Sequence, residues 1–222
     1  MIKIYGIPLS AHTRKAIVTA ILKDIDYVVE AAVIPFIPPR NWATLSPTGL
    51  IPAMEDGDFS TAESTSICVY LERKKPAPPI LPAGDRDYSK AMFFDGYSGW
   101  IFRTFIRGLF FQRIISPQIY KAPTDQVLVD DLLANQRPKI FGYLESRIEG
   151  KFLAGPALSL ADISIVSNLI NYQYLGLKID PGQYPKLSKY TADILALEPF
   201  REALKRETPF AGLMGLDRSF VP

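Results

Sequence analysis

Glu63 and Ser64 form a polar pair that could bind a small zwitterion at the start of a helix. Apolar residues at helical spacing follow the pair, at Ile67, Tyr70 and Leu71, and this spacing predicts a helix that begins there. The first turn of a helix carries backbone N–H groups without intrahelical partners, at the positive end of the helix dipole. A carboxylate bound there would also accept from the Ser64 hydroxyl, while Glu63 could hold an amine. The alternative is that Ser64 only caps its helix and that Glu63 is solvated.

A proline lies between a polar loop and a short predicted strand, 53–56, ahead of this helix. Proline lacks a backbone N–H and would interrupt strand pairing at this place. Most X–Pro bonds are trans, so the residues alone predict a trans bond between Ile51 and Pro52. Asp56 and Gly57 are a strong signal for a two-residue turn, which predicts a hairpin to a further strand.

Ser10 is a second hydroxyl placed where a helix is expected to begin. It lies between a predicted strand over 2–5 and a predicted helix over 13–22, so that the helix N-terminus points toward it. The residues alone leave two roles open for Ser10. Its hydroxyl could donate to a reacting group, or it could cap the helix and do no chemistry.

His12 and Cys68 are the single histidine and the single cysteine of the chain. These numbers exclude an intramolecular disulfide and leave no Cys/His cluster for zinc, so we expect no metal site. His12 has no carboxylate close in sequence that would orient it as a base, and we expect it to be structural or solvent-facing. Cys68 falls within the helix predicted from residue 64, and we expect it in the core.

The elements that would position these residues form two parts. A strand, a helix and a strand over 2–32 predict a βαβ unit, and a strand pair and a helix over 53–72 add ββα. A proline-rich segment follows, through which neither helix nor strand can continue. We therefore predict an α/β domain over 1–75, a linker over 76–87 and an all-α domain over 88–222.

The C-terminal part carries four predicted helices with long apolar faces, over 88–115, 124–149, 159–175 and 184–197. Strand signals are absent from this part of the sequence, so we predict an all-α bundle. The third helix has the clearest start. Ser159 is its predicted N-cap, and Asp162 would reach back from the third helical position as a variant of the capping box. We assign both residues a role in folding.

The composition indicates a soluble globular protein. The chain has 222 residues, of which 48% are hydrophobic and 22% charged, and its net charge is +2. Such a weak basic excess argues against a dedicated nucleic-acid surface. The N-terminus has no apolar run of the length of a signal peptide, and no stretch reaches the length of a membrane span. We expect a cytoplasmic protein in a reducing compartment, without a nucleic-acid or membrane partner.

The pattern S-P-x-G-x-I-P-x-x-x-D-G from Ser46, with Glu63 eleven residues beyond the proline, resembles the glutathione-binding half of cytosolic glutathione transferases. The resemblance implies a thioredoxin-like N-terminal domain followed by an all-α helical bundle, and a cis bond at Pro52. It implies that the backbone of Ile51 pairs with the cysteinyl part of glutathione, while Glu63 and Ser64 hold the γ-glutamyl end. Glutathione would be a co-substrate, and no cofactor would be bound permanently.

The pattern G-x-P-x-S-x-x-T-R, from Gly6 to Arg14, resembles the phi class of that family. The resemblance implies that Ser10 donates a hydrogen bond to the glutathione thiolate. Other classes use a tyrosine near the end of the first strand, which makes Tyr5 the second candidate; the alternative for Tyr5 is packing in the interior. Omega-class relatives hold a cysteine at the place of Ser10, so the resemblance disfavours thiol–disulfide exchange.

One part of the glutathione site departs from the phi-class pattern. Where those relatives carry a histidine and a lysine for the glycyl carboxylate, this chain has Ile37 and Pro38. Arg40 is the only cation of that segment, and Asn41 and Trp42 offer other donors. We therefore expect weak binding of glutathione, or Arg40 to hold its glycyl end, or that end to stay in solvent.

The resemblance implies that the electrophile pocket lies on the first helices after the linker. We assign Tyr97, Trp100 and Phe105 to this pocket, although most aromatic residues at helical spacing belong to a core. Three arginines lie on the same stretch, at Arg103, Arg107 and Arg113. They could face a polar or acidic substrate, or they could form a solvated or dimer-facing stripe.

These features predict a detoxifying glutathione transferase that joins the glutathione thiolate to small hydrophobic electrophiles. The same thiolate would serve a glutathione-dependent peroxidase or dehalogenase. A non-catalytic ligand-binding or scaffold protein of this fold is the alternative from another class; Ile37 and Pro38 favour it, and Ser10 together with the pair at Glu63 and Ser64 opposes it. The resemblance also implies a homodimer, with the helix from Glu63 and the first all-α helices at its interface.

Overall fold

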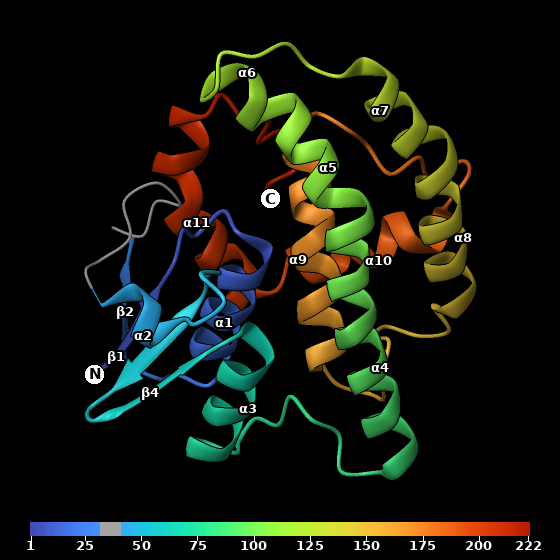
Figure 1. Ribbon diagram of the computed structural model, residues 1–222. Helices are drawn as coiled ribbons and strands as arrows, with labels where there is room; N and C mark the ends of the chain where they lie inside the picture. The colour runs from blue at the N-terminus through green and yellow to red at the C-terminus, as the bar shows by residue number, and fades with distance from the viewer. Residues whose placement is uncertain (32–40) are drawn as a thin grey trace.

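The N-terminal part is a four-stranded mixed sheet with helices packed against it (Figure 1). The computed structural model describes residues 1–31 and 41–222. The strand order is β2-β1-β3-β4, with bounds Tyr27–Glu30, Ile2–Tyr5, Ala53–Asp56 and Phe59–Ala62. β1 pairs parallel with β2 and antiparallel with β3, and β3 pairs antiparallel with β4. This topology confirms the thioredoxin-like fold expected from the order of the elements.

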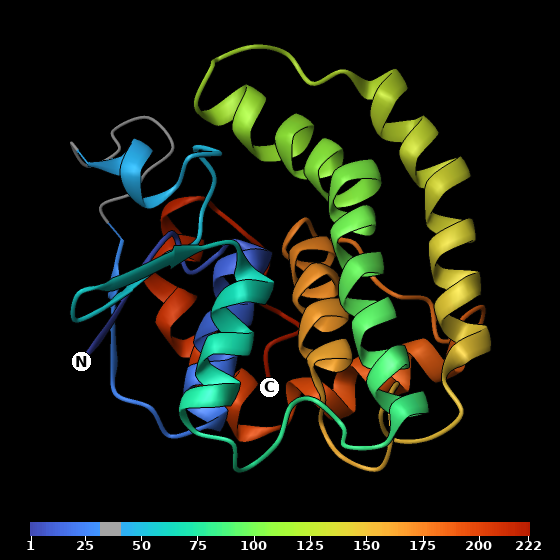
Figure 2. The same cartoon turned by 60° about the horizontal axis from the view of Figure 1, so that its bottom comes forward.

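Two long helices lie between the sheet and much of the helical part. α1 (Ala11–Leu22) and α3 (Ser64–Lys74) lie side by side between the sheet and the helical part (Figure 2). The short helix α2 (Trp42–Leu45) packs through Trp42 and Leu45 on Ala53, in a small cluster separate from the main core. One side of α1 thus supports the sheet, and its other side contacts the C-terminal helices.

The C-terminal part is helical, and its longest element is a bent arm over 85–118 (Figure 1). The arm consists of α4, η1, α5, η2 and α6, with bounds Asp85–Ile101, Phe102–Ile106, Arg107–Phe110, Phe111–Ile115 and Ser116–Gln118. η1 and η2 are π-helical turns, which a period of 3.6 residues does not predict. α7, η3 and α8 return beside the arm, with bounds Gln126–Asp131, Leu132–Gln136 and Arg137–Arg147.

α9 (Leu160–Tyr174) is the central helix of this part, and α10 (Pro185–Leu195) and α11 (Glu198–Leu213) pack nearby. Every residue of α9 except Gln173 is buried. Its start confirms the predicted capping box, because Asp162 Oδ2 accepts from the backbone N–H of Ser159 at 2.9 Å. Asp162 Oδ1 also accepts from the Tyr190 hydroxyl at 2.8 Å, and burial raises the pKa of this carboxyl.

Arg14 of α1 joins the two parts through a buried polar network. Its side chain is 0% exposed, and its Nε and Nη2 atoms donate to the two carboxylate oxygens of Glu207 in α11 at 2.6 and 2.8 Å. Nη1 donates to Asn171 Oδ1 at 2.8 Å and to the backbone oxygen of Ser167 at 2.6 Å, both in α9. The position of α1 is therefore set by groups far along the chain.

Lys15, the next residue, makes a second buried junction. Its ammonium group pairs with Asp95 of α4 and donates to the Thr65 hydroxyl of α3 at 2.8 Å. The hydroxyls of Thr65 and Ser164 donate to Asp95 at 2.7 and 2.6 Å. Four helices thus meet at one carboxylate, and each of its oxygens has a charged or hydroxyl partner.

Candidate active site

The starts of α1 and α3 meet at one place, although they are about fifty residues apart in the chain. His12 Nδ1, in the first turn of α1, lies 3.4 Å from the Oγ atom of Ser64, the first residue of α3. Ser64 is only 2% exposed, and His12 is half-buried. The structure therefore brings together the two polar segments that the sequence marks as helix starts.

Glu63 forms the cap of α3. Its backbone has a φ of 78°, and its Oε2 atom accepts from the N–H groups of Thr65 and Ser66 at 2.9 and 3.1 Å. The alternative in which Ser64 caps the helix is therefore wrong, because Ser64 is already helical and donates to Glu63 Oε1 at 3.1 Å. Glu63 is exposed, so its carboxylate also faces solvent and could accept from an amine.

Backbone N–H groups remain free where the two helices begin. Within the part of the chain that the structure describes, the N–H groups of Ala11, His12 and Ser64 have no hydrogen-bond partner. Each group lies at the positive end of a helix dipole, where an anion is stabilised. The site can therefore accept anionic groups at two adjacent points.

The bond between Ile51 and Pro52 is cis. The trans bond expected from the residues alone is therefore wrong, and the cis bond implied by the family resemblance is confirmed. The oxygen of Pro52 accepts from the N–H of Glu63 at 3.2 Å, which ties this edge to the start of α3. Among residues 1–31 and 41–222, the backbone of Ile51 has no hydrogen-bond partner, so it is free to pair with an extended ligand.

Ser10 is the N-cap of α1, and this position is compatible with both roles foreseen for it. Its Oγ atom accepts from the N–H of Thr13 at 3.5 Å, which leaves the hydroxyl hydrogen free to be donated. The loop before Ser10 lies very close to the helix: a Cβ atom at Gly6 would meet Thr13 Oγ1 at 2.4 Å. Only glycine allows this approach, which holds Ser10 over the start of α1.

The Tyr5 hydroxyl already has a charged partner, because it donates to Glu55 Oε2 at 2.5 Å. Burial and this carboxylate raise the pKa of Tyr5 to about 12. Its ring packs in the small cluster with Trp42 and Leu45. The geometry therefore favours Ser10 over Tyr5 as the donor to a thiolate.

His12, which we expected to be structural or solvent-facing, lies at this site. Its ring packs edge-on against Phe102 of the arm, with ring centroids 4.6 Å apart, so it lies between the start of α3 and the helical part. Burial, together with the charge of Lys15, lowers the pKa of His12 to about 4, so the imidazole is neutral at pH 7. The sequence feature that could indicate this location is the position of His12 two residues after Ser10, within the first helical turn.

Cys68 lies in the core, as expected. Its side chain is 0% exposed, and its sulfur lies 3.3 Å from the Thr19 hydroxyl. Burial raises the pKa of the thiol to about 11, so it is not a nucleophile at neutral pH.

The residues assigned to the electrophile pocket fall in two different environments. Phe105 is 0% exposed and packs against Phe141 and Tyr172, so it belongs to the core and its assignment to the pocket is corrected. Tyr97 and Trp100 stack on each other with centroids 5.5 Å apart. The aromatic residue of the arm that contacts His12 is Phe102, which the assignment did not include.

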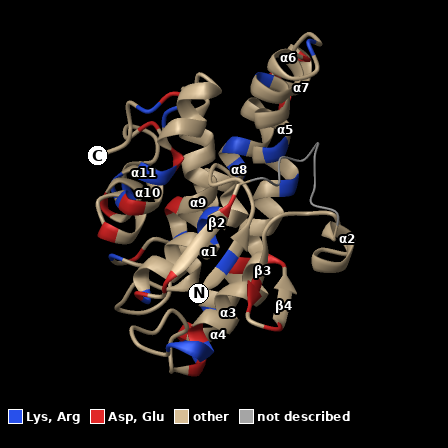
Figure 3. Ribbon diagram, turned by 90° about the vertical axis from the view of Figure 1, so that its left-hand side faces the viewer, with Lys and Arg blue, Asp and Glu red and all other residues tan. Residues whose placement is uncertain are grey.

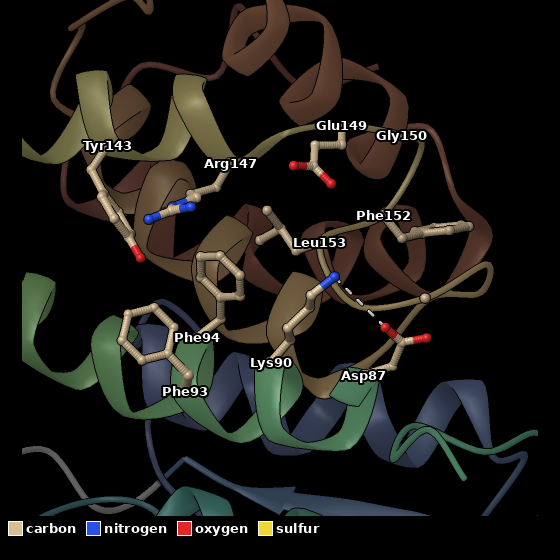
Figure 4. A pocket seen from close by; sticks show the side chains of 11 residues that line it. Asp87, Lys90, Phe93, Phe94, Tyr143, Arg147, Glu149, Gly150, Phe152 and Leu153 are labelled. Atoms are coloured by element: carbon tan, nitrogen blue, oxygen red, sulfur yellow. Dashed lines mark ion pairs between the residues drawn. The ribbon is translucent and has the colours of Figure 1, made fainter. Parts of the chain in front are cut away.

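The face of α4 with Tyr97 and Trp100 turns toward α8. Tyr97 also stacks on Phe93 at 5.8 Å and packs edge-on against Tyr143 of α8 at 5.1 Å. A cavity of about 410 Å³ lies beside this face, between α4, α8 and the segment 149–155 (Figure 4). Arg147 extends into it, and its guanidinium lies over the Tyr143 ring at 5.1 Å. Neither Ser10 nor Ser64 lines this cavity.

Further expectations concern metals, membranes and the glycyl end of glutathione. In the described ranges, no group of three or more His, Cys, Asp and Glu side chains could hold a metal ion. The same ranges contain no helix long and apolar enough to cross a membrane. Ile37, Pro38 and Arg40 lie outside the described residues.

Comparisons with known proteins agree on one family. A family model described as "Glutathione S-transferase, N-terminal domain" matches residues 4–79, and one described as "Glutathione S-transferase, C-terminal domain" matches residues 110–207. The chain is 27% identical over 205 residues to a probable glutathione S-transferase of Oryza sativa subsp. japonica, and the match covers 87% of this chain and 91% of that protein.

Solved structures show the same architecture. A glutathione S-transferase from Rhodospirillum rubrum F11 matches with a TM-score of 0.82 and 23% identity, and the match covers 92% of each chain. Glutathione S-transferase-I bound with the ligand lactoylglutathione matches with a TM-score of 0.80 and 22% identity, over 92% of this chain and 99% of that chain. At these identities the similarity shows the shared fold.

Proposed function

Because this chain belongs to the glutathione S-transferase family, we propose that it binds glutathione where α1 and α3 begin and transfers the thiolate to small hydrophobic electrophiles. The observation that carries the proposal is the meeting of two helix N-termini, bridged by the 3.4 Å contact between His12 Nδ1 and Ser64 Oγ. One N-terminus suits a carboxylate, and the other suits a thiolate.

In this proposal the γ-glutamyl end of glutathione lies at α3. Its carboxylate accepts from the free N–H of Ser64 and from the Ser64 hydroxyl, which would turn away from Glu63 Oε1, and its amine contacts the exposed carboxylate of Glu63. The cysteinyl part pairs with the free backbone of Ile51, on the edge that Pro52 joins to α3. Arg40 is our proposed partner for the glycyl carboxylate.

The sulfur would then lie at the start of α1, within reach of Ser10. A thiol with a pKa of about 8.5 is only about 3% ionised at pH 7, and lowering the pKa by about two units requires about 2.7 kcal/mol of preferential thiolate stabilisation. A hydrogen bond from a hydroxyl to an anion contributes about 1.5–3 kcal/mol, and a helix N-terminus adds about 0.3–1 kcal/mol. The Ser10 hydroxyl and the free N–H groups of Ala11 and His12 could together supply this stabilisation of the thiolate.

The thiolate forms a bond to the electrophilic carbon, and the leaving group departs with its electron pair. No covalent bond between the protein and the substrate is needed. Phe102 and its neighbours on the arm would border the electrophile, because Phe102 contacts His12. We also propose a detoxifying role in the cytoplasm.

We further propose that the chain acts as a homodimer through α3 and the first part of the arm. Exposed aromatic side chains on these surfaces support this proposal. Phe59 is 44% exposed and stacks on Tyr70 of α3, while Phe93 of α4 is 50% exposed. Exposed apolar surfaces of this kind commonly mark contacts with another protein chain.

Replacing Ser10 tests the proposed chemistry. Ser10→Ala should lower kcat/KM for glutathione and 1-chloro-2,4-dinitrobenzene about tenfold to hundredfold, because the donor to the thiolate is lost. Ser10→Thr, which retains both hydroxyl and cap, should restore most of the activity. Tyr5→Phe is the matched control, since it removes a hydroxyl already bound to Glu55.

Retention on immobilised glutathione separates binding from catalysis. The proposal would be supported if the wild type binds glutathione and turns over the substrate, and if turnover is lost in Ser10→Ala but kept in Tyr5→Phe. Binding without turnover would leave a non-catalytic carrier, and a loss in Tyr5→Phe alone would move the catalytic role to Tyr5.

A further inference from the structure

Arg103 of the arm is a cation without a partner in the described part of the chain. It is exposed and makes no ion pair or hydrogen bond there. Its side chain runs back along the helix, because a Cβ atom built at Gly99 would lie 3.5 Å from Arg103 Nη1. The guanidinium therefore lies over the turn at Gly99, where glycine leaves room for it.

This part of the arm reaches the first two turns of α1 through two side-chain contacts. Asp95 pairs with Lys15, and Phe102 packs on His12, so the turn at Gly99 lies between two contacts with α1. The charge of Arg103 also contributes to the lowered pKa of His12. Arg103 is therefore close to the place where α1 and α3 begin. In Figure 3, segments with Lys and Arg follow the arm near α5, above the sheet.

The other charges that face His12 already have partners. Lys15 is paired with Asp95, and the carboxylate of Glu63 accepts from two N–H groups at the start of α3. Arg103 has no such compensation. Arg107, one turn further along the arm, is likewise exposed and makes no ion pair within the described ranges. Arg103 and the two helix N-termini therefore place positive charge near the exposed carboxylate of Glu63.

Phe102, the residue before Arg103 in the arm, adds a flat apolar surface to this region. It is half-buried, and its ring meets the His12 ring at an interplanar angle of 74°. An aromatic ring beside a free guanidinium suits a ligand with a conjugated apolar part and a carboxylate, which a guanidinium binds with two parallel hydrogen bonds. A neutral electrophile would use the ring and leave the cation unused.

We propose that the electrophile side of this site selects anionic substrates, aromatic or conjugated carboxylates whose acid group pairs with Arg103 while the flat part packs on Phe102. The inference rests on the proposed glutathione transfer and specifies its second substrate. The step itself is unchanged: the thiolate forms a C–S bond, and the leaving group departs with its electron pair.

Two matched electrophiles test the inference. 4-Chloro-3-nitrobenzoate carries a carboxylate, and 4-chloro-3-nitrobenzamide carries a neutral amide at the same ring position; in both, chloride leaves. Each kcat/KM is divided by the second-order rate constant for the uncatalysed reaction of the same electrophile with glutathione. This removes the difference in intrinsic reactivity between the two electrophiles. Arg103→Gln should lower the carboxylate-to-amide ratio about fivefold, as expected for a partly exposed ion pair, and Arg107→Gln should lower it less.

Arg147→Gln is the matched control, because Arg147 lies over Tyr143 and lines the separate cavity between α4 and α8. An unchanged ratio in Arg103→Gln, or an equal fall in Arg147→Gln, would overturn the inference. A rise in KM for glutathione by the same factor with both electrophiles would assign Arg103 to glutathione and would also overturn it.

Equilibrium binding separates this inference from the proposed function. Unreactive 3-nitrobenzoate and 3-nitrobenzamide are titrated into the full chain by calorimetry, with and without S-methylglutathione. Tighter binding of the benzoate, lost in Arg103→Gln, supports the anion site even if the wild type turns over neither electrophile. Equal binding of the two compounds would reject the site whatever the turnover.

Discussion

Protonation of His12 should destabilise the folded chain as the pH falls. The pKa of His12 is lowered to about 4 by burial and by Lys15, whereas an unfolded histidine titrates near 6.5. The unfolded state therefore binds a proton first, and folding free energy is lost as the pH falls from about 6.5 through about 4. Between pH 7 and pH 5 this loss is about 2 kcal/mol, and it levels off near 3 kcal/mol below pH 4.

The assay is direct, because His12 is the single histidine of the chain. In untagged protein one imidazole Hε1 signal reports its pKa by NMR titration. Urea unfolding of the wild type and of His12→Gln at pH 7 and pH 5 gives the free energy. The wild type should lose about 2 kcal/mol more than His12→Gln, since other titrating groups affect both proteins. An imidazole that titrates near 6.5, or equal losses in the two proteins, would refute the reasoning.

Three further predictions test the junction, the loop before α1 and the buried thiol. Arg14→Met leaves Glu207 buried without its cation and should lower the free energy of unfolding in urea by about 3–5 kcal/mol. The double variant Arg14→Met/Glu207→Leu should recover much of this free energy. Additive losses in the two single variants and the double variant would contradict the coupling between the two side chains. Gly6→Ala places a Cβ atom 2.4 Å from Thr13 Oγ1 and should cost about 1–3 kcal/mol in thermal unfolding, a cost that adding Thr13→Ala should reduce. Cys68, with its pKa raised to about 11, should react with a thiol-specific reagent at pH 8 only as fast as the chain unfolds, and a fast native reaction would count against its burial.

The parts that the sequence predicts well are those set by local pattern. The βαβ and ββα units appear where the spacing predicts them, and the capping box at Ser159 and Asp162 appears as predicted. The start of α3 at Ser64 was predicted from apolar spacing. Each of these depends on residues within a few positions of one another, so the chain itself carries the signal.

The parts that it misses depend on distant contacts. Glu63 caps α3 with a positive φ, a conformation that favours glycine and that residue type alone does not indicate. Phe105 and Phe102 are both aromatic residues of the arm, yet one lies in the core and the other contacts His12, and the π-helical turn that contains both shifts the helical phase between them. The environment of His12 is set by α3 and η1, which no local pattern contains.

The buried junction at Arg14 and Lys15 has a consequence for dividing the chain. A fragment that ends before α4 would keep the sheet, α1 and α3, but it would remove the carboxylate partners of Arg14 and Lys15, because Glu207 and Asp95 come from the other part. The N-terminal part is therefore not an autonomous module. Transplanting it onto a foreign helical bundle would succeed only if the new host supplied acidic side chains at the same two positions.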